Sequence, residues 1–136
     1  GVVTSVTGNT CTVERTDLPM LFDVRLQAIE DEAESFINVK PKLNSVVVCG
    51  MIDNMQAEWL VLQCSEIDEV TITVGGVIYK INADGHLIQK DNDTMWDAVK
   101  LLIEAVEPII ILQGRNPDLI KLAQAKVKFK NIYNGT

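Results

Sequence analysis

The chain has 136 residues, 47% of them apolar, and carries 19 acidic against 12 basic residues, a formal net charge of −7. This length suits one domain, or one domain with an appendage, and the apolar content is sufficient for a folded core. The acidic balance argues against binding to a nucleic-acid backbone as the main function, because such binding relies on clustered lysine and arginine.

Targeting and redox signals are weak in this sequence. No signal peptide is recognisable, the start at Gly1 leaves a removed leader open, and the apolar run at 108–112 is too short to span a membrane. Cys11, Cys49 and Cys64 fit neither a zinc site nor a disulfide framework in number and spacing. We expect them to be buried thiols in a reducing compartment.

The first part of the chain reads as a series of short strands. Alternating residues at 2–6 and 11–15 flank a turn that contains Gly8 and Asn9, which predicts a hairpin. After an interruption at Leu18 and Pro19, residues 22–29 alternate with period two. That alternation predicts a half-exposed strand with the following residues on its inner face: Phe22, Val24, Leu26 and Ala28.

The next segment begins with an acidic link at 30–34, interpreted as a solvated loop or helical turn, and a short strand or plug at 36–39. Residues 45–52 and 58–63 are then expected to form a central hairpin around Asp53 and Asn54. The continuous apolar run at 46–49 favours a strand covered on both faces.

About five strands within residues 1–65 predict a small five-stranded barrel of the OB type as the first domain. Residues 66–136 are expected to form a second part, which begins with a β-meander extension. Its strands at 70–74, 77–82 and 86–89 are separated by Gly75-Gly76 and Asp84-Gly85 turns.

From Asp93 the apolar period becomes helical, with Asp93 or Thr94 as the cap and Pro108 as the end. The apolar stripe of this helix consists of Met95, Trp96, Val99, Leu102, Ile103 and Val106. A second helix is expected at 117–133, from Pro117 to a stop at Asn134-Gly135. Its apolar side consists of Leu119, Ile120, Ala123, Val127, Ile132 and Tyr133. The fold class is therefore mainly β with two C-terminal helices (α+β).

No catalytic constellation is recognisable, so we expect no enzyme activity, no cofactor and no metal site. His86 is interpreted as a surface turn residue, and the Gly75-Gly76 pair lacks the following lysine and helix start of a phosphate loop. Three lysines of the second helix are interpreted as partners for Glu104 or Glu107: Lys126, Lys128 and Lys130. Binding to nucleic acid is not expected.

The second part carries more apolar surface than a small barrel can cover. The candidates for a subunit interface are Trp96, Leu102, Ile109, Ile110 and Ile111. Burial within one chain explains these residues equally well, and the sequence does not separate the two interpretations.

Several segments of the chain form a familiar series of strands, turns and helices. The series begins with Gly-Val-Val-Thr-Ser-Val at 1–6, Asn-Thr-Cys-Thr-Val at 9–13 and Phe-Asp-Val-Arg-Leu-Gln-Ala at 22–28. It continues through the following positions: Pro41, 44–48, 66–68, 71–74, 84–85, 95–106 and 119–132. Together these segments resemble the OB domains of phage baseplate and tail-spike proteins of the baseplate assembly protein V type.

This resemblance implies a structural part of a phage tail baseplate, hub or related contractile injection machine, encoded by a prophage. It implies a homo-oligomer, with a trimer favoured, and contacts with other tail or baseplate proteins. The expected locations are the bacterial cytoplasm during assembly and then the phage tail. Neither a long repeating β-helix nor a His-x-His tip is present, which favours a hub or adaptor over the spike itself. The alternative is an OB-type binding module for oligosaccharide or single-stranded nucleic acid.

Overall fold

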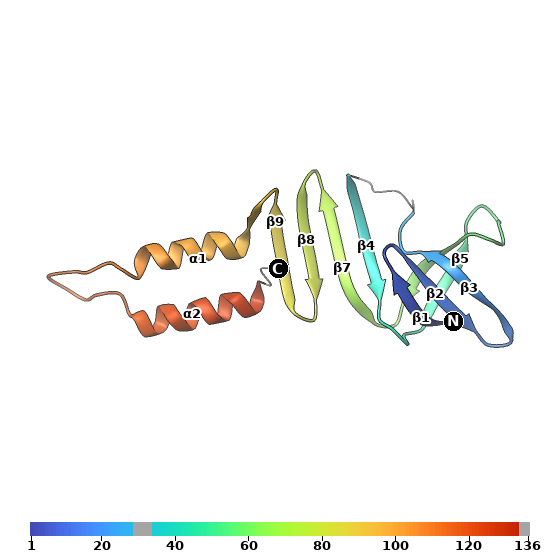
Figure 1. Ribbon diagram of the computed structural model, residues 1–136, viewed down its shortest axis with the longest axis horizontal. Coiled ribbons are helices and arrows are strands. Elements are labelled where there is room, and N and C mark those ends of the chain that lie inside the picture. Colours follow the sequence, from blue (N-terminus) through green and yellow to red (C-terminus); the bar gives the residue numbers. More distant parts are fainter. Residues whose placement is uncertain (29–33, 134–136) are drawn as a thin grey trace. The chain divides into compact units, whose positions relative to one another are not determined.

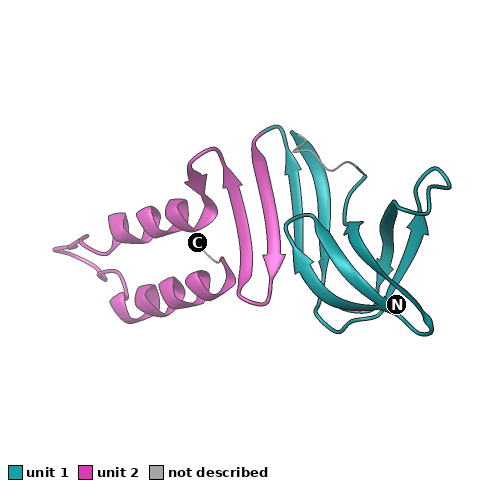
Figure 2. Ribbon diagram, turned by 45° about the vertical axis from the view of Figure 1, so that its right-hand side comes forward, with its two compact units in different colours: residues 1–75 teal, residues 76–136 magenta. Residues whose placement is uncertain are grey.

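The computed structural model describes residues 1–28 and 34–133 (Figure 1). The chain divides into two compact units, Gly1–Gly75 and Gly76–Thr136 (Figure 2). Strands dominate the described residues and both helices lie at the C-terminal end, which confirms the mainly β fold class with two C-terminal helices.

The first unit contains seven strands within the described residues. They are β1 (Val2–Thr7), β2 (Thr10–Arg15), β3 (Leu18–Arg25), β4 (Ser35–Pro41), β5 (Val47–Met51), β6 (Trp59–Cys64) and β7 (Ile67–Val74). Five of them form one sheet in the order β1-β2-β3-β6-β5, where β3 and β6 are parallel and the other neighbours antiparallel.

The two outer strands of this sheet, β1 and β5, meet at a single isolated bridge between Val2 and Val46. Val3 N donates to Ser45 O at 2.9 Å, and Val47 N donates to Gly1 O at 2.8 Å. This contact is not a continuous ladder, so the described strands do not form the closed five-stranded barrel that the sequence predicts.

β4 is the main departure from the expected strand series. The sequence predicts a short strand or plug at 36–39, but β4 pairs antiparallel with β7, from Ser35 opposite Val74 to Pro41 opposite Ile67. Strands β4 and β7 thereby belong to a second sheet, and this pairing holds residues 67–74 within the first unit. The sequence-based boundary after residue 65 falls before β7, whereas the contacts within the chain divide it after Gly75.

The core of the first unit lies on one face of the five-stranded sheet. Its buried members are Val3, Cys11, Val13, Leu21, Val24, Leu26 and Val47. Trp59 and Val61 of β6 pack against them. Apart from Cys11, the buried members of this core are aliphatic.

A bulge in β3 corrects the predicted inner face of that strand. Cys11 lies opposite Val24 but Val13 lies opposite Leu21, so β3 has one residue more than β2 between the two pairs. Asp23 takes up the extra length with φ 53°, and Phe22 turns outward with 65% of its surface exposed. Val24 and Leu26 are buried as predicted.

The ends of β3 also differ from the sequence-based prediction. Leu18 and Pro19 lie inside the strand and do not interrupt it, because the turn occurs one step earlier, at Asp17 with φ 58°. The strand ends at Arg25, and Ala28 is exposed. Ile29, and the acidic link apart from Glu34, lie outside the described residues.

The central hairpin is confirmed, with β5 and β6 antiparallel and with positive φ at Asp53 and Asn54. The prediction that the apolar run at 46–49 is covered on both faces is wrong. Val47 is buried, but Val46 and Val48 are 55% and 56% exposed, so one face of the apolar run is open. A run of valines is compatible with one covered face as well as two, and β5 lies at the end of the strand order.

The second unit contains three strands and two helices within the described residues. They are β8 (Val77–Asn82), β9 (Gly85–Lys90), β10 (Asp93–Thr94), α1 (Met95–Val106) and α2 (Leu119–Ile132). β8 and β9 form the predicted hairpin, with Asn82 opposite Gly85. His86 lies within β9 and not in a turn, and it pairs as an isolated bridge with Tyr133 beyond the end of α2.

Both helices begin at side-chain caps. Thr94 caps α1 by accepting from Asp97 N at 3.1 Å, as the sequence predicts, and α1 ends before Pro108. α2 starts two residues after the predicted Pro117, because Asp118 is the cap and accepts from Lys121 N at 3.0 Å. The predicted stop at Asn134-Gly135 lies outside the described residues.

Candidate interaction surface

Helices α1 and α2 form an antiparallel hairpin (Figures 1 and 2). The seam, where the two helices face each other, buries few apolar side chains. Ile103 of α1 is the one buried apolar side chain among the described residues of the second unit. Trp96, Val99 and Leu122 reach only intermediate burial. At the edge of the seam Lys126 Nζ contacts Glu104 Oε1 at 3.0 Å, which confirms the predicted pairing for Lys126.

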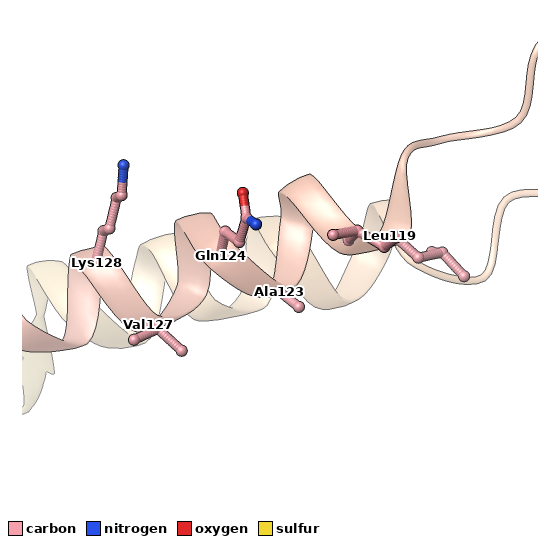
Figure 3. Close-up of a pocket in the computed structure, with 6 residues that line it drawn as sticks. Leu119, Ala123, Gln124, Val127 and Lys128 are labelled. Atoms are coloured by element: carbon pink, nitrogen blue, oxygen red, sulfur yellow. The ribbon is translucent and has the colours of Figure 1, made fainter.

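The outer side of α2 carries a row of exposed apolar side chains, the α2 stripe. It consists of Leu119, Ile120, Ala123 and Val127. Spacings of three and four residues place these side chains along one side of a helix. Ile120 is 73% exposed and Val127 60%. Together with Gln124 and Lys128 the stripe lines an open, almost entirely apolar hollow of about 600 Å³ (Figure 3).

Helix α1 carries a second exposed apolar row, the α1 stripe. It consists of Met95, Ala98, Leu102 and Ala105. Leu102 is 67% exposed, and the neighbouring Leu101 is exposed to the same extent. Apolar residues thus surround most of α1, a pattern typical of a helix that is buried on more than one side.

The segment between the two helices is also apolar and exposed. Ile109, Ile110, Ile111 and Leu112 are each more than one third exposed, and Leu112 reaches 95%. Ile111 N donates to Asn116 Oδ1 at 2.6 Å, which holds part of this segment in place. Exposed apolar residues that follow one another at the end of a helical hairpin are typical of a contact surface.

Of the five predicted interface residues, four are exposed within this chain and Trp96 is half-buried against the seam. Whether any of them contacts a second chain stays a prediction. The sequence-based set leaves out Leu101, Leu112, Ile120 and Val127, which are as exposed as its members. The sequence places Ile120 and Val127 on the apolar side of the second helix, but a helical spacing of apolar residues fits burial within one chain as well as exposure at an interface.

The two helices differ in charge. α1 contains Asp97 and Glu104 against Lys100, a net charge of −1. α2 contains four lysines and no acidic residue, a net charge of +4. This difference favours contacts between unlike helices and disfavours contacts between two copies of α2.

Two further polar arrangements lie outside the helices. Tyr79 Oη and His86 Nδ1 lie 3.1 Å apart, and no group of three His, Cys, Asp or Glu side chains among the described residues could hold a metal ion. Arg15 lies over the Trp59 ring, 5.5 Å from its centroid, beside a hollow of about 290 Å³.

The cysteines are poor nucleophiles. Burial, assisted by the neighbouring Cys49, raises the pKa of the Cys11 thiol to about 11. Burial also raises the pKa values of Cys49 and Cys64, although the chain's amino terminus and Arg15 oppose the shift at Cys49. Because the thiolate is the reactive form, these shifts favour the protonated, less reactive form of all three thiols at neutral pH.

Comparison with protein-family models, with curated proteins and with solved structures finds no match. Among the described residues, neither α1 nor α2 is long and apolar enough to cross a membrane.

Proposed function

We propose that the chain is a non-enzymatic structural component that acts by oligomerisation and protein–protein contacts. The observation that carries this proposal is the thin core of the second unit, where Ile103 is the single buried apolar residue described. Ordering a chain segment costs conformational entropy that burial of apolar surface must offset. A second chain that covers the exposed stripes supplies the missing burial.

The proposed setting is a phage tail baseplate or hub, or a related contractile injection apparatus. Its support is the resemblance of the strand and turn series to phage baseplate OB domains. The five-stranded sheet, with its bridge between β1 and β5, is compatible with a partly open barrel of the OB type. In this setting the partners are further copies, with a trimer favoured, and other baseplate proteins. The locations are the bacterial cytoplasm during assembly and then the tail.

Light scattering coupled to size exclusion tests the oligomer. We expect a mass of three times the 15.1 kDa chain, retained on dilution through the micromolar range. A strict monomer at high protein concentration would contradict the proposed function. The setting has its own test, because tail genes are clustered: a gene that lies among genes of unrelated metabolism would count against a baseplate role.

A further inference from the structure

We propose that the first unit binds a small carboxylic acid with an apolar tail, in the hollow that Arg15 and Trp59 line. This space is called the Arg15 hollow below. The inference goes beyond the proposed function, because residues of the first unit alone form the hollow and binding there does not depend on oligomerisation.

The Arg15 hollow lies where the two ends of the five-stranded sheet meet. Residues of β2, β3, β5 and β6 line it, together with Gly1 beside β1. Three of its lining residues, Val13, Leu21 and Val47, are buried members of the core. Its volume of about 290 Å³ is at the lower end for small-molecule sites and holds about ten water-sized atoms. A ligand that fits is therefore small and makes mostly apolar contacts.

Arg15 brings a cation to this apolar space. Its Nε and Nη2 donate to Pro19 O at 2.9 and 2.6 Å, and its guanidinium lies over the Trp59 ring. These contacts hold one edge and one face of the guanidinium. Because arginine has five N–H donors, Nη1 and Nη2 each keep a hydrogen for another acceptor. Two donors side by side match the two oxygens of a carboxylate.

Arg15 has no carboxylate partner within residues 1–28 and 34–133, although the chain carries 19 acidic residues. Glu58, the acidic residue that precedes Trp59, pairs with Arg25 instead. Gly1 N also borders the hollow, but it donates to Val47 O at 2.9 Å. The guanidinium therefore lines the hollow without a counter-charge from the described part of the chain.

A single arginine favours a ligand with a single negative charge. A doubly charged phosphate would leave excess negative charge beside a chain whose net charge is already −7. Burial raises the pKa of the Cys49 thiol, whereas the amino terminus and Arg15 lower it. The positive charge of Arg15 thus reaches the β5 side of the hollow, where Cys49 lies.

The test is a titration of the full chain with hexanoate, followed through the indole signals of the two tryptophans in proton–nitrogen correlation spectra. Trp96→Phe identifies the Trp59 signal, because only one indole then remains. We expect hexanoate to shift this signal and to saturate. Hexanol has a similar tail without the charge, and we expect it to bind at least about tenfold more weakly. Arg15→Gln should weaken hexanoate binding by a similar factor.

A second pair of variants keeps both Arg15 and Trp59. Val48 lines the hollow and is 56% exposed, so Val48→Glu places a carboxylate of the protein at its open side. Val46→Glu is the matched control, because Val46 is 55% exposed two residues earlier and lies outside the lining of this hollow. We expect Val48→Glu to lose hexanoate binding and Val46→Glu to retain it.

Saturable hexanoate binding that is lost in Arg15→Gln and in Val48→Glu supports the inference. Equal affinity for hexanol, a Trp59 signal that hexanoate does not shift, or unchanged affinity in Arg15→Gln overturns it. Tighter binding of hexyl phosphate than of hexanoate overturns the assignment to a carboxylate. If Arg15→Gln unfolds the first unit, the two glutamate variants decide, and equal hexanoate affinity in both overturns the site. The oligomeric mass is measured separately and is independent of these results.

Discussion

Asp23 decides which side chains of β3 reach the core. Its positive φ accommodates the extra residue of the bulge, and the strand changes phase at this point. Leu21 and Val24, three residues apart, consequently point inward together, while Phe22 points out. A strand without the bulge would keep period two and could not bury both.

Two alanine substitutions in β3 test this phase change. Val24→Ala removes two methyl groups from a fully buried position, and we expect a loss of about 2–3 kcal/mol in the free energy of unfolding. Phe22→Ala removes a larger but exposed side chain, and its cost should stay within about 0.5 kcal/mol. Urea unfolding at one fixed chain concentration measures both. The reverse order of costs would show that Phe22, and not Val24, is the inward residue.

At the level of elements, the end of α2 meets the start of β9 so closely that only glycine fits. A Cβ on Gly85 would lie 2.6 Å from the Ile132 carbonyl oxygen and 3.1 Å from that of Asn131. The bridge between His86 and Tyr133 lies next to this contact. The β8–β9 turn therefore fixes where the second helix ends against its own hairpin.

Gly85→Ala should for this reason loosen α2 from β9. Its φ of 137° is unfavourable for alanine and the added methyl meets backbone atoms, so we expect a cost of about 1–3 kcal/mol. Hydrogen exchange of the α2 amides should accelerate. Gly8→Ala is the control, because φ is also positive there, at 58°, but no atom lies within 4 Å of the added methyl. Equal exchange in α2 for the two variants would refute the close contact.

For the whole molecule, apolar burial is distributed unevenly. Among the residues that the structure describes, seven buried apolar residues belong to the core of the first unit and one belongs to the second unit. The net charge of −7 is uneven as well, because α2 alone carries +4. The second unit thus combines a thin core with a basic, apolar helix, which suits a protein partner better than a self-contained function.

The same charge distribution yields a prediction about nucleic acid. We expect no saturable binding of a labelled single-stranded oligonucleotide, even at low salt. The four lysines of α2 are outweighed by the net charge of −7 of the whole chain, which repels the phosphate backbone. Fluorescence anisotropy measures this, with a basic oligonucleotide-binding domain as the positive control. Saturable binding that weakens steeply with salt would restore the alternative of an OB-type binding module.

The candidate interface is only partly predictable from the sequence. The sequence predicts apolar residues at helical spacing on both helices, and the predicted interface residues Leu102 and Ile109 to Ile111 are exposed. The pattern did not separate the buried Ile103 from the exposed Leu102, which are neighbours in the chain. Consecutive side chains of a helix point about 100° apart, so one can face the seam while the next faces solvent. Which of the two faces the seam depends on the position of the partner helix.

The sequence by itself determined the local features of this protein: the glycine and asparagine turns, the Thr94 cap, the end of α1 before Pro108 and the two C-terminal helices. Each depends on residues within a few positions, so short-range sterics and hydrogen bonds are enough. Only the tertiary structure decided the pairing of β4 with β7, the bulge at Asp23, and which apolar side chains of the two helices are exposed. Those features depend on contacts between segments far apart in the chain, where many pairings satisfy the same local preferences.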